Sequence, residues 1–185
     1  MTTWSEPDLG TFRFEDDAWT ITVNMPAFKS FQFCEPGRNN GTSNIAIEIG
    51  AESASKPPPP PLIALAKQVV ERQESLAVQL KQALFDDFQG NGPDSGMWWH
   101  GDIATIKEEI AAESQQELGL IGPNDLDELL GSPSIRIRDR TYGYDHPCAI
   151  LGFEALFELE HGIGILTDGH QIFGTGYYTD VSPFS

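Results

Sequence analysis

The sequence predicts an α+β fold in which a mostly antiparallel sheet packs against one long amphipathic helix and one or two shorter helices. Alternating apolar and polar residues, the pattern of strands, occur near both ends of the 185-residue chain. Helical apolar spacing occupies its middle, between Leu62 and Phe88. A chain of this length fits one domain, so residues 1–185 are expected to form a single unit with a proline-rich spacer at 56–61 inside it.

The N-terminal region is expected to form an antiparallel hairpin between Thr11 and Phe28. Its apolar residues alternate with polar ones on both sides of an acidic turn at 15–17, and they are Phe12, Phe14, Trp19, Ile21 and Val23. Pro26 should end the second strand, because proline has no N–H to donate to a neighbouring strand. A loop at 38–41 precedes a further strand from Asn44 to Ile49, with Ile45, Ile47 and Ile49 on one face.

The middle of the chain is expected to contain an extended proline segment followed by the long helix. Pro57 to Pro61 predict a polyproline II spacer, and Pro61 suits the first turn of a helix. Apolar positions then keep helical spacing as far as Phe88, before Gly90-Asn91-Gly92-Pro93 stops the helix. We interpret the proline run as a rigid spacer, with a docking motif for an SH3-like partner as the alternative.

Shorter helices and several strands are expected in the second half. Asp102 can cap a second helix, and Asn124 or Asp125 can cap a short third one. Strands are predicted at 135–140, 148–159, 163–167 and 170–174, with a type I′ turn at Asp168-Gly169 between the last two. The aromatic cluster Met97-Trp98-Trp99-His100 is interpreted as a core plug, with a ligand platform as the alternative.

The C-terminal strands also predict which side chains face the core. Alternation places one apolar set against the helix, namely Ile135, Ile137, Phe153, Ala155, Phe157 and Leu159. It places three arginines on the opposite face, Arg136, Arg138 and Arg140. Glu154, Glu158 and Glu160 have the same spacing on the following strand, so we expect an exposed Arg/Glu ladder between antiparallel neighbours. The alternative is that the arginines bind an anion or an acidic partner.

The charge of the chain restricts its partners. Its 28 acidic and 11 basic residues give a net charge of −17. Such a surface repels nucleic acid and anionic lipid, so we expect no nucleic acid and no membrane as partner. The simplest interpretation of the charge is solubility, and the alternative is that it marks a surface for a basic protein partner. Cys34 and Cys148 lack disulfide or metal-binding spacing and no secretory signal precedes them, so a cytoplasmic chain with reduced thiols is expected.

The last 45 residues are where a metal site or an acid–base pair would be expected first. They contain no Lys or Arg but hold His146, His161 and His170 together with six carboxylates. Adjacent residues on a strand point to opposite faces, so we expect hydrogen bonds to hold His161 while Glu160 points to the other face. Cys148 lacks the context of a catalytic nucleophile. We therefore assign no catalytic or metal-binding residue and expect no cofactor.

Glu160-His161-Gly162-Ile163-Gly164 is the most distinctive motif of the segment from Phe157 to Gly176. The segment resembles the C-terminal signature Trp-x-x-Glu-His-Gly-x-Gly of an uncharacterised family of small bacterial domains. Segments nearer the N-terminus occur in the same order as in that family, namely Leu9 to Phe12, Trp19, Pro26 to Phe28 and the helix from Pro61 to Phe88. Phe157 stands where that signature has Trp. Gly162 and Gly164 fit tight turns or close strand packing rather than a phosphate loop. The resemblance implies a domain of unknown function, similar to small immunity proteins of bacterial polymorphic toxins, which act by binding.

These observations favour a non-enzymatic bacterial protein-interaction domain, immunity-like, that binds a basic partner. The alternative is a metal-dependent or hydrolytic enzyme that uses a site made of Glu160, His161 and His170. Convergence of these three side chains in one pocket would favour the enzyme, and their separation would count against it.

Overall fold

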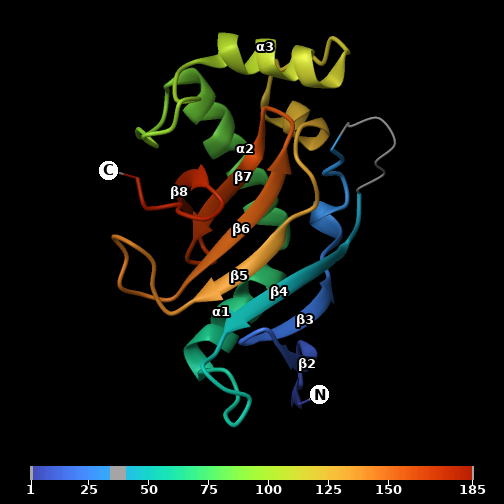
Figure 1. The fold of residues 1–185 in the computed structure, drawn as a ribbon, viewed down its shortest axis with the longest axis vertical. Helices are drawn as coiled ribbons and strands as arrows, with labels where there is room; N and C mark the ends of the chain where they lie inside the picture. Colours follow the sequence, from blue (N-terminus) through green and yellow to red (C-terminus); the bar gives the residue numbers. More distant parts are fainter. Residues whose placement is uncertain (1, 34–40, 185) are drawn as a thin grey trace.

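The computed structural model describes residues 2–33 and 41–184. They form one eight-stranded sheet whose strands lie side by side in the order of the sequence (Figure 1). The strands are β1 (Thr3–Glu6), β2 (Gly10–Glu15), β3 (Ala18–Asn24), β4 (Asn44–Gly50), β5 (Ser134–Arg138), β6 (Cys148–Ala155), β7 (Glu158–Thr167) and β8 (Ile172–Tyr177). Neighbouring strands are antiparallel except β4 and β5, which are parallel. The mostly antiparallel α+β fold is therefore confirmed.

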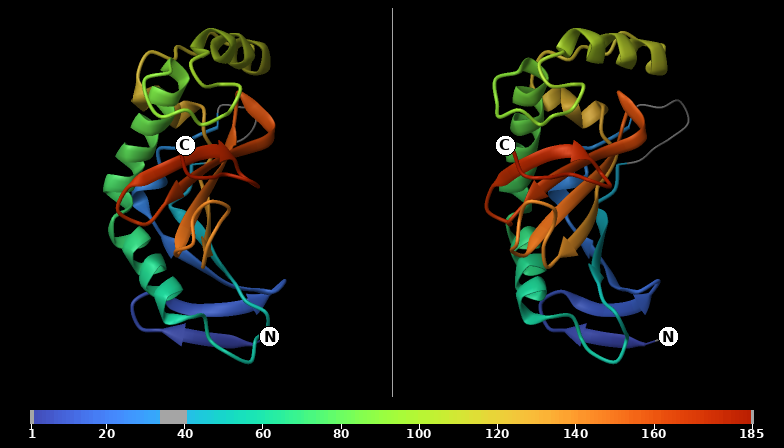
Figure 2. Two further views of the ribbon diagram at one scale, coloured as in Figure 1. Left: turned by 90° about the vertical axis from the view of Figure 1, so that its left-hand side faces the viewer. Right: turned by 60° about the vertical axis from the view of Figure 1, so that its left-hand side comes forward.

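The three α-helices all belong to the crossover that joins the parallel pair, as a parallel connection requires. α1 (Pro60–Glu71) and α2 (Gln73–Gln89) lie in one layer along one face of the sheet (Figure 2). α3 (Ile103–Ser114) lies at the end of the molecule farthest from the N-terminus (Figure 1). No helix in the described part of the chain is both long and apolar enough to cross a membrane.

The prediction of a single long helix is wrong, because the helix is interrupted at Arg72 (φ −101°, ψ 12°). Next to the break, the side chain of Gln73 donates to the carbonyl of Val70 and accepts from the N–H of Ala27, which ties this point of the helix pair to the segment after β3. The interruption lets α1 contact β5 and β6 while α2 contacts β8. Apolar spacing continues through both helices, which is why the sequence pattern does not reveal the break.

The two short helices of the described residues are 3-10 helices. They bear on the expectation that Pro26 ends a strand and on the expected cap of the third helix. η1 (Pro26–Phe28) follows β3 directly, so Pro26 does end that strand. η2 (Pro123–Glu128) begins after Gly122, and the prediction that Asn124 or Asp125 is its cap is wrong. Pro123 has no N–H and can occupy the first helical position. Asp125 instead accepts the N–H groups of Ile121 and Gly122, whereas Asp102 caps α3 as expected.

A turn with two positive φ angles, as type I′ requires, occurs at Asp16-Asp17 (φ 50° and 59°), between β2 and β3. The predicted type I′ turn at Asp168-Gly169 is wrong. Thr167 pairs with Ile172, so four residues form the connection, and only Gly169 of the predicted pair has a positive φ. The carboxylate of Asp168 accepts the N–H groups of residues 170 and 171, which stabilises this longer turn.

The predicted strand 148–159 contains a turn at Leu156-Phe157, so residues 158 and 159 belong to β7. Both turn residues are buried, which is why the apolar pattern continues through the turn. Five of the six expected core residues are buried, but Leu159 is 54% exposed, and its assignment to the core is wrong. The turn reverses the chain before Leu159 and presents its side chain to solvent.

The predicted Arg/Glu ladder is also wrong, although β5 and β6 are antiparallel neighbours. Arg136 lies opposite Ile150 and Arg138 opposite Cys148, while Glu158 and Glu160 belong to β7. The parallel neighbour β4 supplies Glu48 instead, whose Oε1 lies 3.8 Å from the guanidinium of Arg138. The Arg136 guanidinium lies over the ring of Tyr178 at 4.3 Å, and Arg140 follows β5 as an exposed residue.

The main core lies between the sheet and the helices, and a second, smaller cluster lies on the other face of the sheet. This second cluster contains Cys148, Ile150, Leu166 and Val181, under the C-terminal segment. Cys148 is buried, as predicted, and burial raises the pKa of its thiol to about 11. Cys34 and most of the loop expected at 38–41 lie outside the described residues.

Candidate functional site

The structure does not bring Glu160, His161 and His170 together. Glu160 and His161 lie near the start of β7, and His170 lies in the connection beyond its end, roughly 20 Å away for six residues of extended strand. The His170 ring instead contacts Arg72, and its carbonyl accepts from Gln79. Among the residues that the structure describes, no group of three His, Cys, Asp or Glu could hold a metal ion. The three-residue site of the enzyme alternative is therefore not formed.

Glu158, at the start of β7, joins two side chains that the sequence did not connect. Its Oε2 accepts the indole N–H of Trp98 at 2.9 Å, and its Oε1 lies 3.0 Å from Nδ1 of His161. The His161 ring also packs against Tyr177, with ring centroids 4.7 Å apart. The expected hydrogen bonding of His161 is confirmed, and its partner is Glu158.

These contacts shift the pKa values of both members of the pair. The hydrogen bond with Glu158 is the main cause that raises the pKa of His161, and the charge of Glu160 adds to it. Burial acts to raise the pKa of Glu158, but hydrogen bonds from Trp98 and His161 outweigh it and the pKa is lowered. Glu158 therefore stays ionised at neutral pH and favours the charged form of His161.

The two adjacent tryptophans divide the roles that the sequence left open. Trp99 is fully buried and meets Phe157 and Tyr177 edge to face, at 5.9 and 5.5 Å between centroids. It is the core plug. Trp98 remains 37% exposed, packs edge to face on Trp99 at 5.7 Å, and is fixed by its hydrogen bond to Glu158. Of the two tryptophans, Trp98 is therefore the one whose ring a ligand can reach.

Trp98 lines a hollow of about 390 Å³ between α3 and the β6–β7 turn, which we call the Trp98 hollow. Its apolar lining consists of Trp98, Leu156, Phe157 and Leu159, and its polar lining of Glu109, Glu113, Glu158 and Glu160. None of these described lining residues is cationic. Trp98 and Leu159 are two of the few exposed large apolar residues, and exposed apolar groups rimmed by polar ones mark binding sites.

A second hollow, of about 510 Å³, adjoins the first and shares Leu159 and Glu160 with it. We call it the His161 hollow; its other polar lining residues include Ser134, Glu154, His161 and Tyr178. The ring of Tyr178 lies so close to Gly152 that an added Cβ would be 2.0 Å from a ring carbon. Tyr178 also hydrogen-bonds Ser134 at 2.8 Å, so this wall of the hollow is fixed.

The negative charge of the chain is concentrated in the part that builds both hollows. Residues 82–185 carry 18 acidic and 4 basic residues, whereas residues 1–81 carry 10 acidic and 7 basic residues. The later part therefore accounts for −14 of the net charge of −17. Such asymmetry indicates a surface suited to a cationic partner.

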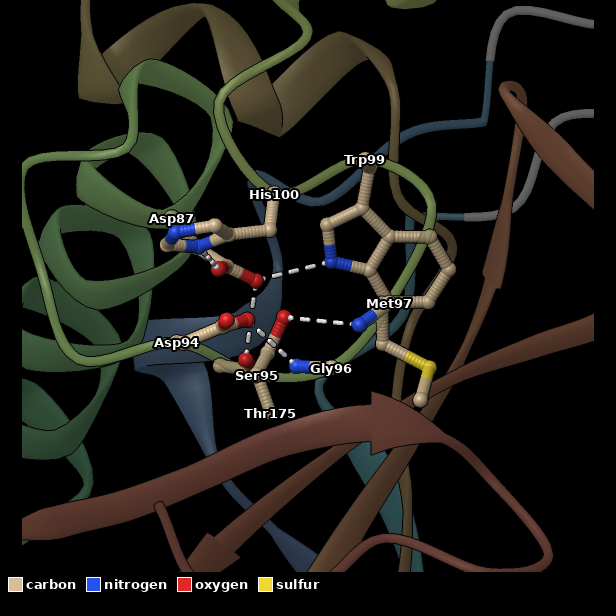
Figure 3. Close-up of polar contacts among 8 residues, drawn as sticks. All are labelled: Asp87, Asp94, Ser95, Gly96, Met97, Trp99, His100 and Thr175. Atoms are coloured by element: carbon tan, nitrogen blue, oxygen red, sulfur yellow. Dashed lines mark hydrogen bonds and ion pairs between the residues drawn. The ribbon is translucent and has the colours of Figure 1, made fainter. Parts of the chain in front are cut away.

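A buried carboxylate, Asp87 near the end of α2, fixes the turn that carries Trp98 (Figure 3). Asp87 is 1% exposed, and its Oδ2 accepts the Trp99 indole N–H at 2.8 Å and the Thr175 hydroxyl at 3.0 Å. Its Oδ1 lies 2.7 Å from Nδ1 of His100. The backbone carbonyl of Asp87 also accepts the N–H of Gly101. Asp87 thus binds the three residues that directly follow Trp98, which fixes the backbone on that side of the tryptophan.

Asp87 and His100 form an Asp–His pair of the kind that hydrolytic enzymes use, so a nucleophile would have to face the second ring nitrogen. Figure 3 shows that this nitrogen points away from Ser95. The Ser95 hydroxyl accepts the N–H of Met97 instead, and Asp94 accepts that of Gly96. The pair and its neighbours therefore stabilise the turn.

The sequence reasoning missed Asp87, Glu109, Glu113 and the exposure of Trp98. One signal for Asp87 exists in the sequence: a carboxylate near the C-terminus of a helix opposes the helix dipole, so it needs specific donors. Trp99 and His100, shortly after the helix stop, supply them. The glutamates of α3 give no such signal, because exposed glutamates are ordinary on a helix.

Comparisons of this chain with protein-family models, with curated proteins and with solved structures found no match. The resemblance to the family of small bacterial domains therefore stays a prediction.

Proposed function

We propose that this chain is a non-enzymatic protein-interaction domain that binds a basic protein partner across the Trp98 and His161 hollows. One observation carries the proposal: Leu159 is 54% exposed and lines both hollows, whose charged lining residues are glutamates and one histidine. Leu159 and Glu160 are the two residues that the hollows share, and we call them the ridge. An apolar group on a ridge can insert into a partner, while the surrounding carboxylates select a cationic surface.

The supporting residues lie on regular secondary structure or are held by hydrogen bonds within the chain. Glu109 and Glu113 lie one turn apart on α3, and Glu160 lies on β7. Trp98 is held by Glu158 and by the turn that Asp87 anchors. A preorganised surface loses little conformational entropy on association, so more of the contact energy appears as affinity.

An immunity protein acts in this way, by covering a surface of a toxin. That narrower role rests on the resemblance of the Glu160-His161-Gly162 segment and on the acidic charge. A toxin with a basic surface would be the partner.

The test compares two charge-neutralised variants of the whole chain. The site variant carries Glu109→Gln, Glu113→Gln and Glu160→Gln, and the control carries Glu15→Gln, Glu52→Gln and Glu71→Gln, which are equally exposed on β2, after β4 and at the end of α1. Proteins captured from the source cells by the wild type are identified by mass spectrometry, purified, and titrated by calorimetry against all three proteins.

We expect a basic partner whose affinity falls at least tenfold for the site variant and less than threefold for the control. The affinity of the wild type should also fall as salt rises from about 50 to 300 mM, because screening weakens exposed charge pairs. Equal weakening by both variants, or a partner with an acidic surface, would contradict the proposal.

A further inference from the structure

We infer that the Trp98 hollow receives an arginine side chain of the partner, with its guanidinium against the Trp98 indole and within reach of Glu109 and Glu113. This inference rests on the proposed function and names the group that the hollow recognises. The observation behind it is the combination, in one hollow of about 390 Å³, of an indole that is 37% exposed and four carboxylates.

The indole of Trp98 is held in one orientation. Glu158 accepts its N–H at 2.9 Å, and Trp99 and Phe157 meet it edge to face at 5.7 and 6.4 Å. Tryptophan is the aromatic residue that attracts cations most strongly, and the attraction increases when the cation is partly desolvated. A fixed, partly exposed indole in an acidic hollow is therefore suited to a cation.

The carboxylates favour arginine over lysine. Glu109 and Glu113 are four residues apart on α3, so they lie on one face of the helix and their carboxylates can be reached by one planar group. A guanidinium can stack on an aromatic ring while its N–H groups donate to carboxylates, whereas an ammonium acts as a point charge. The chain contains such an arginine–aromatic contact of its own, because the Arg136 guanidinium lies 4.3 Å from the centroid of the Tyr178 ring.

The exposed apolar side chain of Leu159 indicates which residue should neighbour the arginine in the partner. Leu159 lies beside the hollow and is 54% exposed, so the residue next to the arginine in the partner should be apolar. The occupant is thus an arginine in an exposed loop or strand of a basic protein, adjacent to an apolar side chain.

The first experiment uses small probes and the indole N–H signals of protein labelled with ¹⁵N. The probes are N-acetyl-arginine methylamide, its neutral isostere N-acetyl-citrulline methylamide, and N-acetyl-lysine methylamide. A Trp98→Phe variant assigns the Trp98 signal, and the buried Trp19, which does not contact Trp98, serves as the internal control. We expect the arginine probe to shift the Trp98 signal saturably, with a dissociation constant on the order of 10 mM. The lysine probe should bind more weakly, and citrulline should cause no shift.

The variant Glu109→Gln/Glu113→Gln should abolish the response to the arginine probe. Equal shifts with arginine and citrulline, an unchanged response in this variant, or no shift with any probe would overturn the inference.

A second measurement separates this inference from the proposed function. Trp98→Leu should weaken binding of the purified basic partner roughly tenfold. If Trp98→Leu binds normally while the three-glutamate site variant does not, the proposed function stands and the arginine site is refuted. If both variants bind normally, both are refuted. Circular dichroism and the unfolding midpoint confirm that each variant is folded.

Discussion

Replacing Asp87 with alanine should destabilise the protein by about 3 kcal/mol. The substitution removes the acceptor of two buried donors, the Trp99 indole N–H and the Thr175 hydroxyl, at residues that are 0% and 2% exposed. An unsatisfied buried donor costs about 1–3 kcal/mol. His100 adds less, because its side chain is 23% exposed and water can replace the carboxylate. Part of the loss is offset, because the variant no longer has the desolvation cost of burying the Asp87 carboxylate.

Urea unfolding followed by tryptophan fluorescence measures the effect, provided that the dependence of the free energy on urea is unchanged. Asp86→Ala is the matched control, since the hydrogen bond that the neighbouring carboxylate accepts from Gln82, at 2.9 Å, is exposed to solvent. It should change the free energy of unfolding by no more than about 0.5 kcal/mol. A loss below about 1 kcal/mol for Asp87→Ala would refute the reasoning that Asp87 anchors the turn.

Two other predictions follow from close contacts near the hollows. Gly152→Ala should destabilise the protein by about 1–3 kcal/mol, because its Cβ would meet the Tyr178 ring at 2.0 Å; Gly119→Ala, which meets only ordinary contacts at 3.7 Å, should be near neutral in the same urea assay. An NMR titration should place the His161 pKa above 6.5, with Glu158→Gln lowering it. Because folding raises the pKa of His161, the stability that this pair adds to the folded protein is complete at a pH below the pKa of His161 in the unfolded chain. It is lost as the pH rises through the pKa of His161 in the folded protein. A His161 pKa at or below 6.5, or one unaffected by Glu158→Gln, would contradict the pairing.

Strands β2, β3 and β4 could be predicted from sequence because they follow the period of two closely, whereas the short strand β1 was not predicted. The hairpin of β2 and β3 and the three buried isoleucines of β4 are where the pattern places them. The break at Arg72 could not be predicted, since the apolar spacing continues through it. The turn at Leu156-Phe157 was missed for the related reason that its residues are buried, so apolarity alone does not distinguish it from a strand.

The candidate site was predictable only in part. His161 and Glu160 were identified because histidines and carboxylates are concentrated near the C-terminus, and both do line a hollow. Their neighbours Glu109 and Glu113 lie about 50 residues earlier in the sequence, and only the tertiary fold brings α3 beside β7. The ladder failed because the turn at Leu156-Phe157 places Glu158 and Glu160 on β7, while the register of β5 and β6 sets Arg136 and Arg138 opposite apolar positions.

The central claim is that a basic protein contacts the ridge between the two hollows, and site-specific photo-crosslinking tests it most directly. The photoreactive residue p-benzoylphenylalanine replaces Leu159, which is 54% exposed, or Val78, which is 66% exposed on α2 and serves as the control. Both proteins are irradiated in the cells that naturally produce the chain. We predict one dominant adduct with a basic protein from position 159, weakened by Glu109→Gln/Glu113→Gln and missing from position 78. No adduct at position 159, the same adduct at both positions, or an acidic partner would contradict the account.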